Sequence, residues 1–159
     1  AYAFQYGIDC ISICPTNIFG PHDNFSIENG HVIPALIHKC HVSDELCVMG
    51  SGAALREFIY NVDLGKIILR LVNKDKIATK VLICSPCVEI SIGNVAKIIA
   101  KHFNKPLSYD KTKSDGQFRK NTCNAALMTE LGNLEFTEFD VALKHTIEWF
   151  KENFNTCRK

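Results

Sequence analysis

The sequence carries almost no net charge, since 18 Lys and Arg residues stand against 17 Asp and Glu residues and leave +1. A protein that mainly grips a nucleic-acid backbone is expected to be distinctly basic, so this balance argues against that class. No apolar run approaches the roughly 20 residues that cross a bilayer. The N-terminal AYAFQYGID has neither the basic nor the apolar region of a signal peptide. We therefore expect a cytoplasmic protein without a nucleic-acid or membrane partner.

Cysteine is too scarce for a disulfide scaffold, because eight residues fall below the roughly 8–10% of such chains. Five lie in apolar runs, where a free thiol behaves as a small hydrophobic side chain: Cys10, Cys14, Cys40, Cys47 and Cys84. We expect these five to be reduced and buried. The CxxC spacing of 84–87 lacks a second pair to complete four zinc ligands, and no helix begins there. A structural role is therefore favoured over a metal or redox site.

Strand-like and helix-like segments alternate along the chain, which indicates an α/β architecture with crossover connections. The strand-like segments are 8–14, 46–49, 58–60 and 80–84. The helix-like segments are 32–40, 63–72, 91–103, 124–131 and a last one from 137 to 154. The polar loops 16–30 and 112–121 are the expected places for binding residues.

Local signals predict how three of these helices begin. Asp63 is placed to start a helix whose apolar face contains Leu64, Ile67, Ile68, Leu71 and Val72. Ser91 is expected to cap the next long helix. Thr137 and Asp140 have the spacing of a capping box for the last helix, whose apolar stripe would be Leu143, Ile147, Phe150 and Phe154.

Three histidines cluster around the helix-like segment 32–40. For His38 and His41 a solvated helical face is favoured over a shared metal, because carboxylate ligands nearby are few. His31 differs, since it lies at the helix start directly after a polar loop. The helix dipole there disfavours the imidazolium cation. A catalytic role for His31 is the resulting hypothesis.

Gly50-Ser51-Gly52, with Arg56 close behind, allows two interpretations. Backbone N–H groups and a guanidinium fork suit a phosphate. A plain tight turn suits the same residues, and the spacing matches neither a Walker A loop nor GxGxxG. Both interpretations stay open from the residues alone.

The string PTNIFGPHDNF at 15–25, followed by GHVIP at 30–34, resembles the GDP-L-fucose synthases. These are extended short-chain dehydrogenases/reductases that act on nucleotide sugars. Two more segments match in the same order, GxGxxxREFI at 50–59 and KSDGQFRK at 113–120. The element PTNxxGP alone is shared with other nucleotide-sugar epimerases and reductases, whereas the longer matches are more specific. The resemblance covers essentially the whole chain.

This resemblance implies that residues 1–159 form the C-terminal part of a Rossmann-type NAD(P)-binding fold together with the smaller α/β substrate-binding domain. Family members also carry a Gly-rich phosphate loop, which does not occur here, and a Tyr-x-x-x-Lys pair on the helix before this first strand, which neither Tyr2 nor Tyr6 forms because positions 6 and 10 hold Tyr and Cys. We therefore expect the N-terminal cofactor-binding half to be absent and 1–7 to be the tail of the helix that bears this pair. The resemblance also implies a homodimer for the whole enzyme, and a chain that is inactive alone.

The activity implied is NADPH-dependent conversion of GDP-4-keto-6-deoxy-D-mannose to GDP-L-fucose, by 3,5-epimerisation and 4-keto reduction. His31 matches the family's catalytic acid, while the family's catalytic cysteine is expected before Ala1. The matching NADP(H)-binding residues are Pro15, Thr16, Asn17, Ile18 and His31. The residues expected to contact the GDP-sugar are Lys39, Met49, Arg56 and Asp115, with Met49 standing where relatives have Trp.

Two other functions remain as alternatives. One is another nucleotide-sugar epimerase or dehydratase of the same superfamily, against which the segments GHVIPALIHK and KSDGQFRK count. The other is a non-catalytic module that binds a nucleotide sugar.

Overall fold

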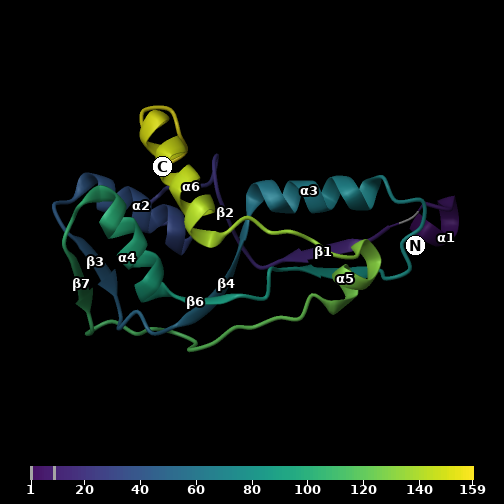
Figure 1. Ribbon diagram of the computed structural model, residues 1–159, viewed down its shortest axis with the longest axis horizontal. Helices are drawn as coiled ribbons and strands as arrows, with labels where there is room; N and C mark the ends of the chain where they lie inside the picture. Colours follow the sequence, from purple (N-terminus) through teal and green to yellow (C-terminus); the bar gives the residue numbers. More distant parts are fainter. Residues whose placement is uncertain (1, 9) are drawn as a thin grey trace.

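Helices and strands alternate along the chain as the sequence predicts, and Figure 1 shows them arranged in two lobes joined by extended strands. This computed structural model describes residues 2–8 and 10–159. The strands are β1 (Ser12–Pro15), β2 (Asn17–Phe19), β3 (Leu46–Met49), β4 (Leu55–Tyr60), β5 (Val81–Cys84), β6 (Glu89–Ser91) and β7 (Leu107–Asp110). The helices are α1 (Tyr2–Tyr6), α2 (Val32–Val42), α3 (Asn61–Val72), α4 (Ile92–Phe103), α5 (Ala125–Leu131) and α6 (Phe139–Glu152).

Most of the strand pairing is parallel, so the connections cross over through helices. β1 pairs with β5, and β3 pairs with β7, both in parallel. The middle sheet has the order β2–β4–β6, in which β4 and β6 run antiparallel. Thr16 alone separates β1 from β2, so the chain passes there from one sheet to the next. The carboxyl end of β1 therefore lies at the junction of two sheets.

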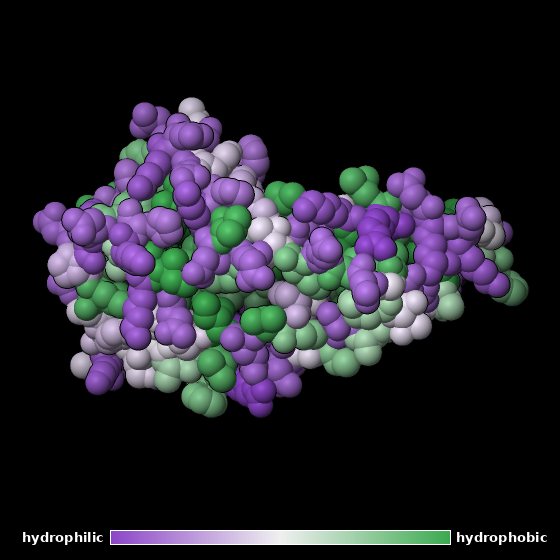
Figure 2. All heavy atoms as spheres, viewed as in Figure 1, coloured by the Kyte–Doolittle hydropathy of each residue, from purple (hydrophilic) through white to green (hydrophobic). Residues whose placement is uncertain are grey.

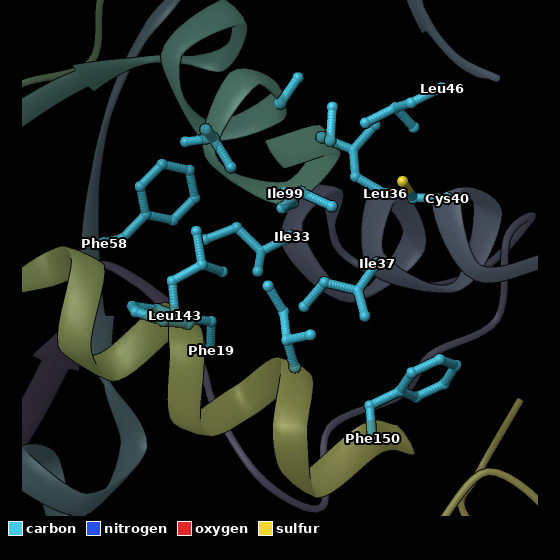
Figure 3. Packing of buried hydrophobic residues seen from close by; sticks show 14 of the residues in the cluster. Phe19, Ile33, Leu36, Ile37, Cys40, Leu46, Phe58, Ile99, Leu143 and Phe150 are labelled. Carbon is cyan, nitrogen blue, oxygen red and sulfur yellow. The ribbon is translucent and has the colours of Figure 1, made fainter. Parts of the chain in front are cut away.

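The larger hydrophobic core lies between α2, α4 and α6. Figure 3 shows Ile33 and Ile37 of α2 directed toward Leu143 and Phe150 of α6, while Cys40 lies on the side of Leu36 and Leu46. The predicted stripe of the last helix is confirmed for Leu143, Ile147 and Phe150, which are all buried, whereas Phe154 is half-buried and lies beyond the end of α6. The predicted cap of α4 is also confirmed, since the side chain of Ser91 accepts a hydrogen bond from the Asn94 N–H. No helix in the described part of the chain is long and apolar enough to span a bilayer.

The lobe that contains β1 and α3 has a smaller core, and two predictions of burial fail there. Cys10 and Cys14 are exposed, whereas Cys40 and Cys84 are buried and Cys47 is half-buried. The reason is that β1 pairs only with β5 among the described residues, and α1 buries none of its residues. The β1 segment is also shorter than predicted, and Asp9 lies outside the described residues.

The apolar face predicted for α3 is covered only in part. Ile67 and Leu71 are buried, but Ile68 is 39% exposed and Val72 is 77% exposed. The helix begins at Asn61, two residues before the predicted start. Figure 2 shows apolar side chains reaching the surface in the middle of the molecule, while polar side chains cover most of α6.

The capping box predicted for the last helix is wrong. The N–H and hydroxyl groups of Thr137 donate to the carboxylate of Asp63, at 2.7 and 3.0 Å. α6 begins only at Phe139, with Glu138 as its N-cap and no side-chain hydrogen bond. Thr137 therefore fastens the start of α6 to α3 instead of capping its own helix.

The solvated helical face predicted for His38 and His41 is also wrong. Both are half-buried. The His41 ring lies 4.5 Å from the ring of Phe154, and a ring nitrogen of His38 lies 2.7 Å from the Phe25 carbonyl oxygen. Burial, together with the neighbouring Lys105 and Lys151, lowers the pKa of His41. These histidines pack α2 against α6.

Glu130 provides a pH-dependent contribution to stability. Its carboxylate accepts hydrogen bonds from Lys74 Nζ and the Thr79 N–H, each at 2.7 Å, and the Lys74 bond contributes most to lowering its pKa to about 2. A depressed folded-state pKa stabilises the fold above the unfolded value, and this contribution is lost as the pH falls. Glu130→Gln should therefore lower the thermal midpoint at pH 7, and the difference from the parent should shrink between about pH 4.5 and 2.

The matched control is Glu152→Gln, at an exposed glutamate near the end of α6. Thermal unfolding followed by circular dichroism from pH 2 to 8 gives both differences. A Glu130→Gln deficit that stayed constant down to pH 2 would contradict the ionic origin of this contribution.

Candidate functional site

An open cavity of about 470 Å³ lies at the junction of the two sheets. Its walls come from the end of β1, the start of α2, β4 and the 112–122 loop. The residues that line it are Cys14, Pro15, Thr16, Asn17, Ile18, His31, Glu57, Ile83, Lys120 and Thr122. Ligands of α/β proteins bind beyond the carboxyl ends of parallel strands, and β1 ends here. The five residues predicted to bind NADP(H) all belong to this lining: Pro15, Thr16, Asn17, Ile18 and His31.

Backbone and side-chain hydrogen bonds fix the 15–18 segment in place. The Thr16 N–H donates to the Cys84 carbonyl at 3.1 Å, and the Asn17 amide donates to the Glu57 carbonyl at 2.8 Å. The hydroxyl oxygen of Thr16 is buried and has no hydrogen-bond partner. A buried polar atom without a partner is unusual in a folded protein and calls for an explanation, such as a bound ligand.

The residues of this cavity suit a nicotinamide cofactor. Thr16 Oγ1 offers an unused polar atom, and the half-buried Ile18 offers an apolar surface for a flat ring. Lys120 brings a positive charge to the cavity lining. The residues fit the group on these chemical grounds.

His31 lines the cavity and is the N-cap of α2. Its side chain is exposed and makes no capping hydrogen bond, so the imidazole is available to a ligand. The pKa of the nearby Asp23 carboxyl is raised, because its burial outweighs the opposing effects of the Asn24 N–H, His31 and Arg158. A helix start fixes the backbone of His31 while its ring stays accessible.

Arg56 holds the 112–122 loop through main-chain carbonyl groups. Its guanidinium donates to the carbonyl oxygens of Leu55 and Gln117, at 2.7 Å each. A third and longer hydrogen bond reaches the Phe118 carbonyl at 3.4 Å. Contact between Arg56 and a diphosphate stays a prediction, and in this structure the side chain tethers the loop beside the cavity.

Asp115 closes the Gly50–Gly52 turn. Its carboxylate accepts hydrogen bonds from the Ser51 hydroxyl at 2.6 Å and the Ser51 N–H at 2.7 Å, and another from the Gly52 N–H at 3.2 Å. The Ser51 hydroxyl bond contributes most to lowering the pKa of Asp115. Gly50 has φ +83°, and a Cβ there would lie 2.4 Å from the Asp115 carboxylate, so glycine is required. Since Asp115 takes the Ser51 and Gly52 N–H groups, the geometry favours the tight-turn interpretation.

The remaining predicted GDP-sugar residues lie on the α2–β3 side of the molecule. Lys39 donates to the Cys47 carbonyl at 2.6 Å. Met49 ends β3 beside Asp110 and is 69% exposed. These two residues, Arg56 and Asp115 all lie outside the cavity lining that contains His31. The structure therefore gathers the predicted cofactor residues into one cavity and distributes the predicted GDP-sugar residues beyond it.

Sequence reasoning missed one prominent residue of this cavity. Glu57 is 2% exposed, and its carboxylate accepts hydrogen bonds from the Ser85 hydroxyl at 2.7 Å and the Thr122 N–H at 3.0 Å. The available signal was a glutamate directly before the apolar residues Phe58–Tyr60, with which it shares the buried part of β4. An acidic side chain in such a strand implies partners from elsewhere in the chain.

The described residues contain no group of three or more His, Cys, Asp or Glu side chains placed to hold a metal ion. Cys84 and Cys87 of the CxxC segment differ in environment, since Cys84 is buried and Cys87 is exposed. Burial raises the pKa of the Cys84 thiol to about 11, with a smaller contribution from Cys14. A thiol with a raised pKa is a poor nucleophile at neutral pH.

A profile of the NAD dependent epimerase/dehydratase family matches residues 1–84. The chain therefore belongs to this family of α/β enzymes. Within it, the chain is similar over its whole length to GDP-L-fucose synthases. The GDP-L-fucose synthase of Dictyostelium discoideum is 40% identical over 166 residues, covering 100% of this chain and 52% of that protein. The probable GDP-L-fucose synthase of Drosophila melanogaster is 36% identical over 173 residues, covering 100% and 54%.

A solved structure agrees with this relationship. The crystal structure of a GDP-L-fucose synthetase from Naegleria fowleri bound to NADP has a TM-score of 0.90 and is 37% identical, covering 99% of this chain and 52% of that one. The predicted α/β fold is thereby confirmed. The chain spans about half the length of the curated relatives it matches.

Proposed function

We propose that this chain is the C-terminal part of an NADPH-dependent enzyme that converts GDP-4-keto-6-deoxy-D-mannose to GDP-L-fucose. The observation that carries the proposal is the cavity in which Thr16, with its unpartnered hydroxyl, and His31 meet. The relatives named GDP-L-fucose synthase support the substrate class. A relative with bound NADP supports the cofactor.

The uncovered surface of β1 and α1 supports a missing cofactor half in this proposal. Phe4 is 99% exposed and Tyr2 is 69% exposed, and β1 has one unpaired edge among the described residues. Apolar side chains and a free strand edge are suited to packing against further strands and helices. In the whole enzyme, which we propose to be a homodimer, such a half would carry the Gly-rich loop and the Tyr-x-x-x-Lys pair.

The residues of this chain would act on the sugar as follows. The C4 carbonyl acidifies the hydrogens on C3 and C5, because the electron pair released from each C–H bond passes into the carbonyl as an enolate. A base removes the proton, and an imidazole nitrogen of His31 returns a proton to the same carbon from the opposite face. NADPH, when bound, supplies the hydride for C4. Pro15, Thr16 and Ile18 would orient the nicotinamide and exclude water from it.

The direct test is turnover by the full protein that the gene encodes. Purified protein is incubated with GDP-4-keto-6-deoxy-D-mannose and NADPH, and the products are separated and identified by NMR. Formation of GDP-L-fucose with equal consumption of NADPH is expected. Epimerisation of a UDP-sugar without net NADPH consumption would instead favour another nucleotide-sugar epimerase of the family.

Arg56→Ala in the full protein should raise the KM for the GDP-sugar by about 10- to 100-fold. The physical reason is the loss of a charge-assisted contact to the diphosphate, worth roughly 1.5–3 kcal/mol. The value of kcat should change less, because the diphosphate does not react. Steady-state kinetics at saturating NADPH measure both parameters.

Arg70→Ala is the matched control, because Arg70 also donates to main-chain carbonyls, those of Leu131 and Asn133. It lies outside the candidate site, so its KM should stay near that of the parent. An unchanged KM in Arg56→Ala would remove Arg56 from the diphosphate contact and leave it the loop tether that the structure describes.

A further inference from the structure

Glu57 is a buried carboxylate that is held entirely by hydrogen-bond donors. The Ser85 hydroxyl and the Thr122 N–H and hydroxyl groups all donate to it. Within the described residues no ion pair reaches Glu57. A buried carboxylate is costly unless its oxygens are well satisfied, so these donors must stay in place when the site forms.

The donors to Glu57 come from segments far apart in the sequence. Ser85 follows β5, and Thr122 ends a stretch of residues 117–122 that we call the strap. Ser85 also accepts from the Cys87 N–H at 3.0 Å, while its own carbonyl accepts from the Asn124 amide at 2.7 Å. Glu57 therefore joins β4, the end of β5 and the end of the strap at one point.

The strap is also fastened to the first residue of β4 and to β6. The Leu55 N–H donates to the Phe118 carbonyl at 2.8 Å, and Arg119 pairs with Glu89 through two hydrogen bonds of 2.7 and 2.5 Å. In the Arg119–Glu89 pair Arg119 is exposed and Glu89 is half-buried, whereas the Glu57 anchor is buried. Exposed ion pairs contribute little to stability, so the buried anchor should dominate.

We propose that Glu57 is a positioning residue that docks the end of the strap onto β4 and β5 and so forms part of the wall of the cavity that His31 also lines. Lys120 and Thr122 belong to this part of the lining, and the Glu57 main-chain carbonyl also holds the amide of Asn17, another lining residue. Glu57 thus fixes two separate segments of the cavity wall. The ligand part of the test rests on the proposed function, whereas the structural part does not.

Glu57→Gln is the sharpest variant because it preserves size and removes the charge. The new amide N–H groups would face the Ser85 and Thr122 hydroxyl groups, which donate to the carboxylate in the parent. The Ser85 hydroxyl oxygen already accepts a hydrogen bond from the Cys87 N–H. Hydrogen–deuterium exchange of the full protein should become about 10- to 100-fold faster at residues 120–124, the effect expected for hydrogen bonds to a charged acceptor. Exchange in α4 and α6 should not change.

Glu89→Gln is the matched control, since it applies the same substitution to the more accessible anchor of the strap. In Glu89→Gln the rate of hydrogen–deuterium exchange at residues 120–124 should rise by less than about 5-fold. Thr122→Val removes the Thr122 hydroxyl as a donor to Glu57 and keeps the Thr122 N–H. It should therefore reproduce part of the faster exchange expected in Glu57→Gln. The double variant of Glu57 and Thr122 should then fall short of the sum of the single effects. If Glu57→Gln does not fold, Thr122→Val and Ser85→Ala carry the same test.

Ligand binding separates positioning from general stability. In Glu57→Gln, the Kd of NADPH should rise by about 10-fold, because the cavity wall is displaced, while the Kd of GDP should stay within about 2-fold. Unchanged exchange at 120–124, exchange that rises equally throughout the protein, or an equal loss of both affinities would overturn the positioning role. If the parent protein binds neither ligand, the proposed function fails, and the exchange measurements still decide whether Glu57 docks the strap.

Discussion

His31→Gln in the full protein should slow epimerisation of GDP-4-keto-6-deoxy-D-mannose by about 10²- to 10⁴-fold, the usual contribution of a general acid. Glutamine keeps polarity and similar size at the N-cap of α2 but cannot transfer a proton. Because the imidazole makes no capping hydrogen bond, the helix itself should be unaffected. Reduction at C4 should suffer less. Deuterium uptake at C3 and C5 from heavy water reports epimerisation, and NADPH absorbance reports reduction.

His102→Gln provides the control, because His102 is an exposed histidine near the end of α4, away from the cavity lining. Its rates should match those of the parent. Near-normal GDP-L-fucose formation by His31→Gln would refute the catalytic role of His31. An equal fall in both rates would indicate that His31 binds the substrate instead of transferring a proton.

Local patterns predicted the helices whose apolar faces pack against one another within the chain, but not the short strands β2, β6 and β7. α2, α4 and α6 have apolar faces at helical spacing, and those faces meet one another in the larger core. The Ser91 cap depends on atoms three residues apart, so it could also be read directly. The spacing of apolar residues predicts these helices correctly, because the face that is buried is the face on which the helix's own apolar residues recur.

The failures share a different cause, which is that the deciding partner is distant in the sequence. Cys14 sits in an apolar run, yet nothing among the described residues covers that side of β1. Thr137 has the spacing of a capping box but bonds Asp63, which is 74 residues away. Local rules give no weight to such contacts. An expectation of burial also assumes that the covering surface is present.

The candidate site likewise contains residues that a local motif predicted and a residue whose role depends on distant partners. The 15–18 segment and His31 were found through their motif, and the structure brings them together in one cavity. Glu57 was missed because its importance arises from Ser85 and Thr122, which approach it from 28 and 65 residues away. Motif matching identifies residues that touch ligands more readily than residues that hold other residues in place.

Phe150→Ala should lower the free energy of unfolding by about 3–5 kcal/mol, the range for removing a buried phenylalanine. Phe150 is fully buried, and its ring centroid lies 4.6 Å from that of Phe25. It also contacts His38 and His41 on α2 through ring centroids 5.7 and 5.5 Å away. The cavity left behind cannot refill easily, because α2, α6 and the loop at Phe25 all pack on this ring. Chemical denaturation followed by circular dichroism measures the change.

Phe118→Ala is the matched control, because the Phe118 side chain is 63% exposed and only its main chain fastens the strap. Its unfolding free energy should stay within about 0.5 kcal/mol of the parent value. The consequence for the site follows from the Phe25 contact, since Phe25 lies in the loop that leads to His31. Loss of Phe150 should therefore also loosen this loop, giving faster amide exchange at 22–31 than at the strap. A loss of less than about 1 kcal/mol in Phe150→Ala would mean that α6 does not pack on α2 as the structure describes.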